Sequence, residues 1–255
     1  MRNVDNFYRQ VIVKELSYNV FGWLTSSARL CACLLIIISH YTFLIPHYAS
    51  AQSRSEWRDS LEVLNRKLEK TPGDIDLRLR KAEANINLEQ WDYALAEYGK
   101  ILHADEHNLA ALYFRAYVHS QQQHYDLARV DYETFLGLQP RHFEARLGLA
   151  HTLQKMGRKT DTFDQLNTLV EQFPDSATAY AARAAYETEL EMYDIALFDW
   201  DEAIRRQPMN ASFVVSKADV LIRQNRHAEA RTELNRAIRR GIPRYALKEW
   251  LDKCK

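Results

Sequence analysis

The chain has 255 residues, of which only 7 are glycine and 6 are proline. Because these residues form turns and break helices, their scarcity argues against an all-β sandwich or barrel, a collagen-like chain and a flexible linker. Lys+Arg and Asp+Glu both number 34, so the chain lacks the basic surplus with which nucleic-acid-binding proteins neutralise phosphates. We therefore expect a mostly helical protein that binds no nucleic acid.

The first feature along the chain is an apolar segment at residues 30–45, LCACLLIIISHYTFLI, which follows an arginine. Ala49 and Ala51 then form an A-x-A pattern ahead of Gln52. A positive flank, a short apolar core and small residues at its exit are typical of a secretory signal peptide. We interpret residues 1–51 as a signal peptide with a long amino-terminal region and expect an exported protein, either periplasmic or extracellular.

The alternative for the same segment is a membrane anchor that is never cleaved. Residues 30–45 make a run of 16, interrupted by Ser39, His40 and Thr42. A membrane-spanning helix needs about 20 predominantly apolar residues, so the pattern favours the signal peptide. The protein would meet the membrane only if this segment stayed uncleaved.

The segment that follows carries a repeat of 34 residues. Four of the six prolines are spaced by 68, 34 and 34 residues, and they are Pro72, Pro140, Pro174 and Pro208. One series of alanines has the same period and consists of Ala82, Ala116, Ala150, Ala184 and Ala218. A second series consists of Ala94, Ala128, Ala196 and Ala230, with Thr162 at its remaining position. A fixed period between 20 and 50 residues is the signature of a solenoid.

Each period is expected to form two helices. Residues 109–121 and 125–138 are two amphipathic runs, and Pro140 ends the second because proline cannot continue a helix. Two antiparallel helices joined by a short turn cross closely, so a residue at the crossing must be small. Ala116 and Ala128 are expected to occupy that crossing, where a larger side chain would force the helices apart.

This pattern resembles the tetratricopeptide repeat family, whose unit is a 34-residue helix–turn–helix. The family has small residues at positions 8 and 20, a large apolar or aromatic residue at 24 and proline near 32. Position 24 of this chain is Tyr98, Tyr132, Leu166, Trp200 and Leu234. The resemblance implies an all-α solenoid of about five repeats, at residues 75–108, 109–142, 143–176, 177–210 and 211–244. A capping helix (half a repeat) is expected at 52–74.

The carboxyl-terminal segment, residues 245–255, is expected to form the solvating helix that closes the array. Five residues fall on one apolar helical face, namely Ala246, Leu247, Trp250, Leu251 and Cys254. Repeats of a solenoid bury their cores only against neighbouring repeats, so the terminal unit needs a helix whose outer face is polar. Cys254 is therefore expected to be a buried, inert thiol.

A charge pattern inside the repeats supports this register. In four repeats position 7 is basic and position 23 is acidic: Lys81 with Glu97, Arg115 with Asp131, Arg183 with Asp199, and Lys217 with Glu233. The third repeat has neither charge, with Leu149 and Gln165 instead. The joint presence and joint loss predict that the two positions touch across each helix pair.

The third repeat is also expected to be the least stable. Gly148 lies inside its first helix, Thr162 replaces the crossing alanine and Lys159 replaces the aromatic residue found elsewhere. Glycine costs about 1 kcal/mol relative to alanine in a helix interior. The pattern predicts faster amide exchange at residues 146–170 than in the flanking repeats.

The sequence offers little catalytic chemistry. It contains no phosphate-binding glycine loop, H-E-x-x-H motif or nucleophile elbow. Its three cysteines are too few for a disulfide framework and lack the spacing of a zinc site. His103 and His107 lie at a repeat junction, where surface histidines are favoured over a metal site. We expect no catalytic residue, cofactor or metal.

The family resemblance implies that the first helices line a concave groove that binds another protein or peptide. By the family's positions, the partner-binding groove residues are Leu79, Glu83, Tyr113, Tyr117, Gln121, Leu147, His151 and Asp219. Tyr113 and Tyr117 are one helical turn apart, so both can face the groove. Exposed tyrosine is a good interface anchor, but the two rings could instead pack between repeats.

The resulting hypothesis is a non-enzymatic, protein-binding scaffold of the cell envelope or exterior. The alternative is a membrane-tethered assembly factor for an envelope complex, with residues 30–45 uncleaved. A glycan-binding protein or an enzyme subunit is the third possibility, and no residue pattern favours it.

Overall fold

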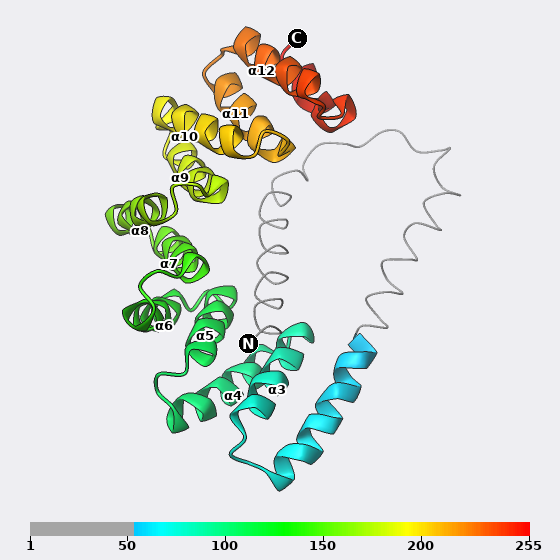
Figure 1. Cartoon of the computed structure of the whole chain (residues 1–255), viewed down its shortest axis with the longest axis vertical. Coiled ribbons are helices and arrows are strands. Elements are labelled where there is room, and N and C mark those ends of the chain that lie inside the picture. The colour runs from blue at the N-terminus through cyan, green and yellow to red at the C-terminus, as the bar shows by residue number, and fades with distance from the viewer. Residues whose placement is uncertain (1–53) are drawn as a thin grey trace, which may run out of the picture. The chain divides into compact units, whose positions relative to one another are not determined.

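The computed structural model describes residues 54–255, so the predicted signal peptide or anchor lies outside the described residues. The described part is all-α, with no strand, as predicted. It divides into two compact units, the first ending at Ile101 and the second running from Leu102 to Lys255. Figure 1 shows the helices of both units.

The first unit consists of three helices. They are the helix at residues 54–70, α3 (Ile75–Asn87) and α4 (Trp91–Ala104), whose last turn belongs to the second unit. The helix at 54–70 buries Leu64 and Leu68. It lies within residues 52–74, where the sequence predicts a capping helix.

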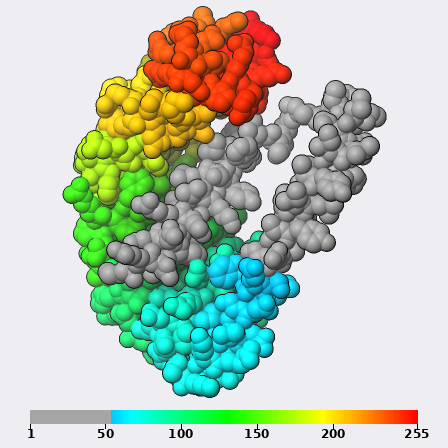
Figure 2. All heavy atoms as spheres, turned by 45° about the vertical axis from the view of Figure 1, so that its right-hand side comes forward, coloured from blue at the N-terminus to red at the C-terminus, as the bar shows by residue number. Residues whose placement is uncertain are grey.

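The second unit is a series of four helical hairpins followed by a short closing segment. The hairpins are α5 (Leu109–Gln121) with α6 (Tyr125–Leu138), α7 (Phe143–Lys155) with α8 (Lys159–Gln172), α9 (Ala177–Glu189) with α10 (Tyr193–Arg206), and α11 (Ala211–Arg223) with α12 (His227–Arg240). Each hairpin packs on the next through α6 with α7, α8 with α9, and α10 with α11. Side chains fill the spaces between successive hairpins in Figure 2.

The first helix of every repeat begins at a side-chain cap. The capping residues recur every 34 residues and are Asp74, Asn108, His142, Ser176 and Asn210. Each side chain accepts a hydrogen bond from a backbone N–H two or three residues later, at 3.0–3.3 Å. These bonds satisfy N–H groups that a helix leaves unpaired at its start, so the cap sets where each repeat begins.

The turn inside every repeat contains one residue in the left-handed conformation. These residues are Glu89, Gln123, Gly157, Glu191 and Asn225, with φ between 59° and 72°. The next N–H donates to the carbonyl five residues back, for example His124 N to His119 O at 2.8 Å. This is the Schellman arrangement that ends a helix, and glycine suits it best because it lacks a Cβ atom. Only the third repeat has glycine there.

Both alanine series lie at the helix crossings, as predicted. Each of the nine alanines is at most 2% exposed. Thr162 is also fully buried, and its hydroxyl donates to the carbonyl of Arg158 at 2.9 Å. The threonine therefore keeps the crossing close while its polar group is satisfied within its own helix.

The predicted charge pairs are confirmed in all four repeats. Arg115 and Arg183 each bind their aspartate with two hydrogen bonds, at 2.6–2.9 Å. Lys81 lies 3.2 Å from Glu97. The fourth pair is the loosest, since Lys217 lies 3.6 Å from Glu233 but 2.6 Å from Asp201.

The third repeat replaces this pair with a different bridge. Arg146, at position 4 of the repeat, donates to Gln165 at 2.7 Å and to the carbonyl of Pro140 at 2.6 Å. Its equivalent in the first repeat, Arg78, binds Glu97 at 2.6 Å. The two helices of the third repeat are thus joined by a guanidinium–amide bond in place of an ion pair. The predicted faster exchange of this repeat stays a prediction.

Gly148 has a packing role that the sequence does not reveal. A Cβ atom built at this position would lie 2.6 Å from Cζ and 2.7 Å from the hydroxyl of Tyr132. Tyr132 is buried at position 24 of the preceding repeat. The glycine therefore lets the tyrosine ring approach the backbone of α7, so it contributes to the packing of α6 against α7.

The closing segment differs in part from the predicted helix. It forms η1 (Arg244–Leu247) followed by α13 (Lys248–Lys253). Leu247, Leu251 and Cys254 are buried, and burial raises the pKa of the Cys254 thiol, as expected for an inert cysteine. The placement of Ala246 on the apolar face is wrong: Ala246 is exposed, because the tighter 3₁₀ turn changes the direction of the residues before α13.

Candidate functional site

The candidate site in the second unit lies on the first helices of its hairpins. In Figure 1, α5, α7 and α9 follow one another on one side of the unit, and α6 and α8 lie on the other. α5 contacts α7, and α9 contacts α11. Side chains at equivalent positions of these helices therefore contribute to one face, as the family resemblance implies.

Tyr113 does not contribute to that face, so its assignment to the groove is wrong. Its side chain is 4% exposed. The ring centroid lies 5.8 Å from Phe135, 6.0 Å from Tyr132 and 5.8 Å from His142. Tyr113 thus fills the space between α5, α6 and the start of α7, which is the alternative that the sequence left open.

Tyr117 and Gln121 continue the same helix and remain accessible. Tyr117 is half-buried, and Gln121 is exposed at the last residue of α5. Their spacing of one turn places them one above the other on a single helix face. They offer a ring with a hydroxyl and an amide, a combination that gives contact area together with hydrogen bonds.

On α7 the two predicted groove residues are both half-buried. Leu147 packs against the cluster formed by Leu169, Val170 and Ala179, so part of its surface is used within the array. Burial, together with the charge of Lys155, lowers the pKa of His151 to about 4. The His151 ring is therefore uncharged at neutral pH and presents a neutral surface.

Asp219 lies half-buried on α11, and its carboxylate accepts a hydrogen bond from Arg223 at 2.7 Å. The two residues are one turn apart on the same helix. An acidic group that is neutralised in this way contributes little net charge to the face. Together with the neutral His151, it makes the face of the second unit nearly uncharged at the predicted positions.

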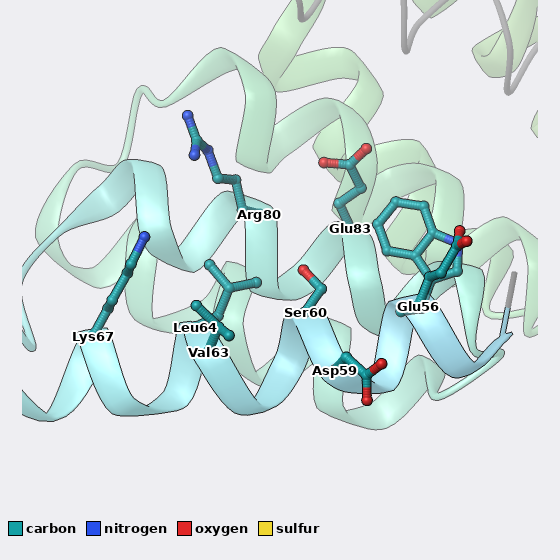
Figure 3. Close-up of a pocket in the computed structure, with 9 residues that line it drawn as sticks. Glu56, Asp59, Ser60, Val63, Leu64, Lys67, Arg80 and Glu83 are labelled. Atoms are coloured by element: carbon teal, nitrogen blue, oxygen red, sulfur yellow. The ribbon is translucent and has the colours of Figure 1, made fainter.

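The other two predicted groove residues, Leu79 and Glu83, lie on α3 in the first unit and are half-buried. Glu83 borders a cavity of about 440 Å³ between α3 and the helix at residues 54–70 (Figure 3). Burial raises the pKa of Glu83, and nearby Arg80 partly offsets that effect. Leu79 does not line this cavity.

Two features of the structure were not anticipated from the sequence. One is the cavity itself, whose lining combines residues of two helices, among them Trp57, Val63 and Arg80. The other is Glu187 on α9, which is 3% exposed and has one carboxylate oxygen without a hydrogen-bond partner. Burial and the charge of Asp199 raise its pKa to about 7, against the opposing effect of Arg183.

Residues 54–255 contain neither a candidate metal cluster nor a helix suited to span a membrane. No group of three or more His, Cys, Asp or Glu residues in this range is placed to hold a metal ion. No helix in the same range combines the length and the apolar character that crossing a bilayer requires. His103 and His107 are both exposed.

The repeat geometry agrees with comparisons to known proteins. Tetratricopeptide repeat family models match residues 109–142 and 181–245. Residues 109–142 and 181–245 thus belong to the tetratricopeptide repeat family. Such repeats form scaffolds that bind other proteins and are typically not enzymes.

The chain is similar to two curated rice proteins (Oryza sativa subsp. japonica). Over 131 residues, 50% of this chain, it is 31% identical to DnaJ protein P58IPK homolog B. Over the same length it is 29% identical to homolog A. The matched stretches span only 27% and 26% of those two proteins.

Solved structures share the tetratricopeptide fold at low sequence identity. A tetratricopeptide repeat protein from Parabacteroides merdae is 21% identical with a TM-score of 0.57, and the match covers 80% of this chain and 79% of that one. YrrB, described as a TPR protein with an unusual peptide-binding site, is 20% identical with a TM-score of 0.55. That match covers 70% of this chain and 92% of YrrB.

Proposed function

We propose that this chain is a non-enzymatic scaffold that binds a protein or peptide through the first helices of its second unit. The observation that carries the proposal is that Tyr117 and Gln121 lie one turn apart on α5, which contacts α7, the helix that carries the neutral His151. Gln121 is exposed and Tyr117 and His151 are half-buried, whereas the alanines at the helix crossings are buried. Such a face would recognise a partner by shape and hydrogen bonds.

Export is part of the proposal, because the apolar segment at 30–45 and the A-x-A pattern before Gln52 are typical of a secretory signal peptide. The partner would then be a protein or peptide of the cell envelope or exterior. Sequencing the amino terminus of the mature protein tests this: a chain that begins at Gln52 supports export with cleavage. A chain that retains residues 30–45 would favour the membrane-tethered assembly factor.

The binding face is tested by affinity capture from the native envelope fraction, using wild type and the variant Tyr117→Ala/Gln121→Ala. We expect the variant to lose at least about tenfold of the captured partner while its helical circular dichroism is unchanged, because truncation of an aromatic anchor commonly costs 2 kcal/mol or more. The matched control is Phe198→Ala, which removes an aromatic ring that is 62% exposed on α10.

Capture by the control should equal wild type. If the Phe198→Ala variant loses the partner and the Tyr117→Ala/Gln121→Ala variant keeps it, the binding face lies on the second helices and the proposal is wrong.

A further inference from the structure

The cavity of the first unit has charges of opposite sign at its two ends. In Figure 3, Lys67 and Arg80 lie toward one end of the cavity, and Glu56, Asp59 and Glu83 lie toward the other. Between them the wall is formed by Ser60, Val63 and Leu64. The surface therefore changes from basic through largely apolar to acidic along the direction of the helix at 54–70.

This surface is also the part of the first unit where solvent reaches apolar side chains. Solenoid repeats bury their apolar faces against neighbours. Val63 is 45% exposed there, and Trp57 is only half-buried. In the described part of the chain, no charged side chain lining the cavity forms a hydrogen bond or ion pair with another side chain. Its charges are available to a partner.

The charge order is complementary to itself. Glu56 and Lys67 are eleven residues apart, which is about 16 Å along a helix. A twofold axis through the helix near residues 61 and 62 would bring Glu56 of each copy to Lys67 of the other. The same axis would bring Arg80 of each copy to Glu83 of the other, because Arg80 lies at the basic end and Glu83 at the acidic end.

We propose that a second copy of this chain covers this face, with the two helices at residues 54–70 packed antiparallel. The contact is isologous, so each ion pair forms twice, and Val63 is buried at the centre. With α3 of each copy, the two helices complete an antiparallel four-helix arrangement. A parallel arrangement would place like charges together and is excluded by repulsion.

The proposal is tested with two charge-reversed forms of the full-length chain. One carries Lys67→Glu/Arg80→Glu, which makes the cavity acidic throughout. The other carries Glu56→Lys/Glu83→Lys, which reverses two of the three acidic groups and leaves Asp59 in place. Sedimentation equilibrium over a concentration series should show that wild type is a dimer. For each variant alone, the dissociation constant of the dimer should be at least about tenfold higher. An equimolar mixture of the two variants should form a heterodimer.

The control is Arg58→Glu/Glu69→Lys, which reverses two charges on the same helix outside the cavity and leaves the net charge unchanged. Its dimer should be as stable as that of wild type, and circular dichroism should show equal helicity in all four proteins. A wild-type chain that is monomeric at every concentration would mean that another part of the chain or another protein covers the face, and would overturn the proposal. Failure of the mixed variants to associate would also overturn it.

Discussion

At the scale of single residues, the turn inside each repeat imposes the clearest local cost. Gln123, Glu89, Glu191 and Asn225 adopt positive φ, where a side chain brings Cβ close to the following carbonyl oxygen. Gly157 occupies the same position of the third repeat without that cost. The repeats thus differ in turn strain although their hydrogen bonds are equivalent.

Gln123→Gly should therefore stabilise the protein by up to about 1 kcal/mol, because relief of the left-handed strain exceeds the entropy that glycine adds to the unfolded chain. Gly157→Gln should destabilise it by about 1 kcal/mol for the reverse reason. Urea denaturation of the two variants measures both effects. Destabilisation by Gln123→Gly would show that the glutamine side chain contributes more than the strain costs.

The contact between Gly148 and Tyr132 gives a second residue-scale prediction. Gly148→Ala should destabilise the protein by about 1–3 kcal/mol, because the new methyl group overlaps the tyrosine ring. Adding Tyr132→Leu, the residue type at position 24 in Leu166 and Leu234, should make the alanine nearly neutral. A double-mutant cycle measures the coupling, and additive effects would contradict the contact.

At this scale, the sequence predicts structure where only one type of residue can meet a packing requirement. The crossing alanines were predictable because only a small side chain lets two helices approach, and the 34-residue period showed which alanines those were. Tyr113 was not predictable in the same way. Whether its ring turns toward the face or into the packing depends on Phe135 and His142, which belong to other helices.

At the scale of helix pairs, ion pairs join the two helices of a hairpin unevenly. The Arg115 side chain is 29% exposed, whereas that of Asp131 is 4% exposed. If Arg115 is removed, a buried carboxylate is left without its counter-ion. If Asp131 loses its charge, Arg115 can still reach water.

Arg115→Met should therefore cost about 3 kcal/mol of stability, and Asp131→Asn only about 1–2 kcal/mol. The combined variant Arg115→Met/Asp131→Leu should recover most of the loss, because an apolar pair needs no charge compensation. Thermal and urea unfolding provide the comparison. Equal costs for the two single variants would show that burial does not determine the asymmetry.

The stability of the hairpin of α9 and α10 depends on pH through Glu187. Glu187 has a pKa raised to about 7 in the folded protein by burial and by Asp199, against 4.5 ordinarily. Below pH 4.5 the Glu187 carboxyl is protonated in both the folded and the unfolded protein, and its contribution to stability is fully present. As the pH rises to about 7, the unfolded chain loses the proton first, so stability falls.

Glu187→Gln resembles the protonated form and should raise stability at pH 8 by up to about 3 kcal/mol, with little change at pH 4. The lowered pKa of His151 makes stability fall as the pH drops below 6.5. The variant is therefore compared with wild type at each pH, so that this effect cancels. A benefit of the same size at both pH values would contradict the assigned pKa.

At the scale of the whole molecule, the 34-residue period predicted a series of helical hairpins, which the described residues form. The residues 109–121 and 125–138 expected as two helices are α5 and α6. The charged cavity could not be predicted, since it requires Lys67 and Arg80 of two helices to lie toward the same end. The binding face was predicted only in outline, because accessibility depends on how successive hairpins pack.

The most direct test of the binding face is hydrogen exchange of the full-length chain with and without the partner identified by capture. Binding should slow amide exchange in α5 and α7, around Tyr117, Gln121 and His151. The exchange rates of α6, α8 and α10 should be unchanged. Protection confined to α6, α8 or α10 would contradict the central claim that the first helices form the binding face.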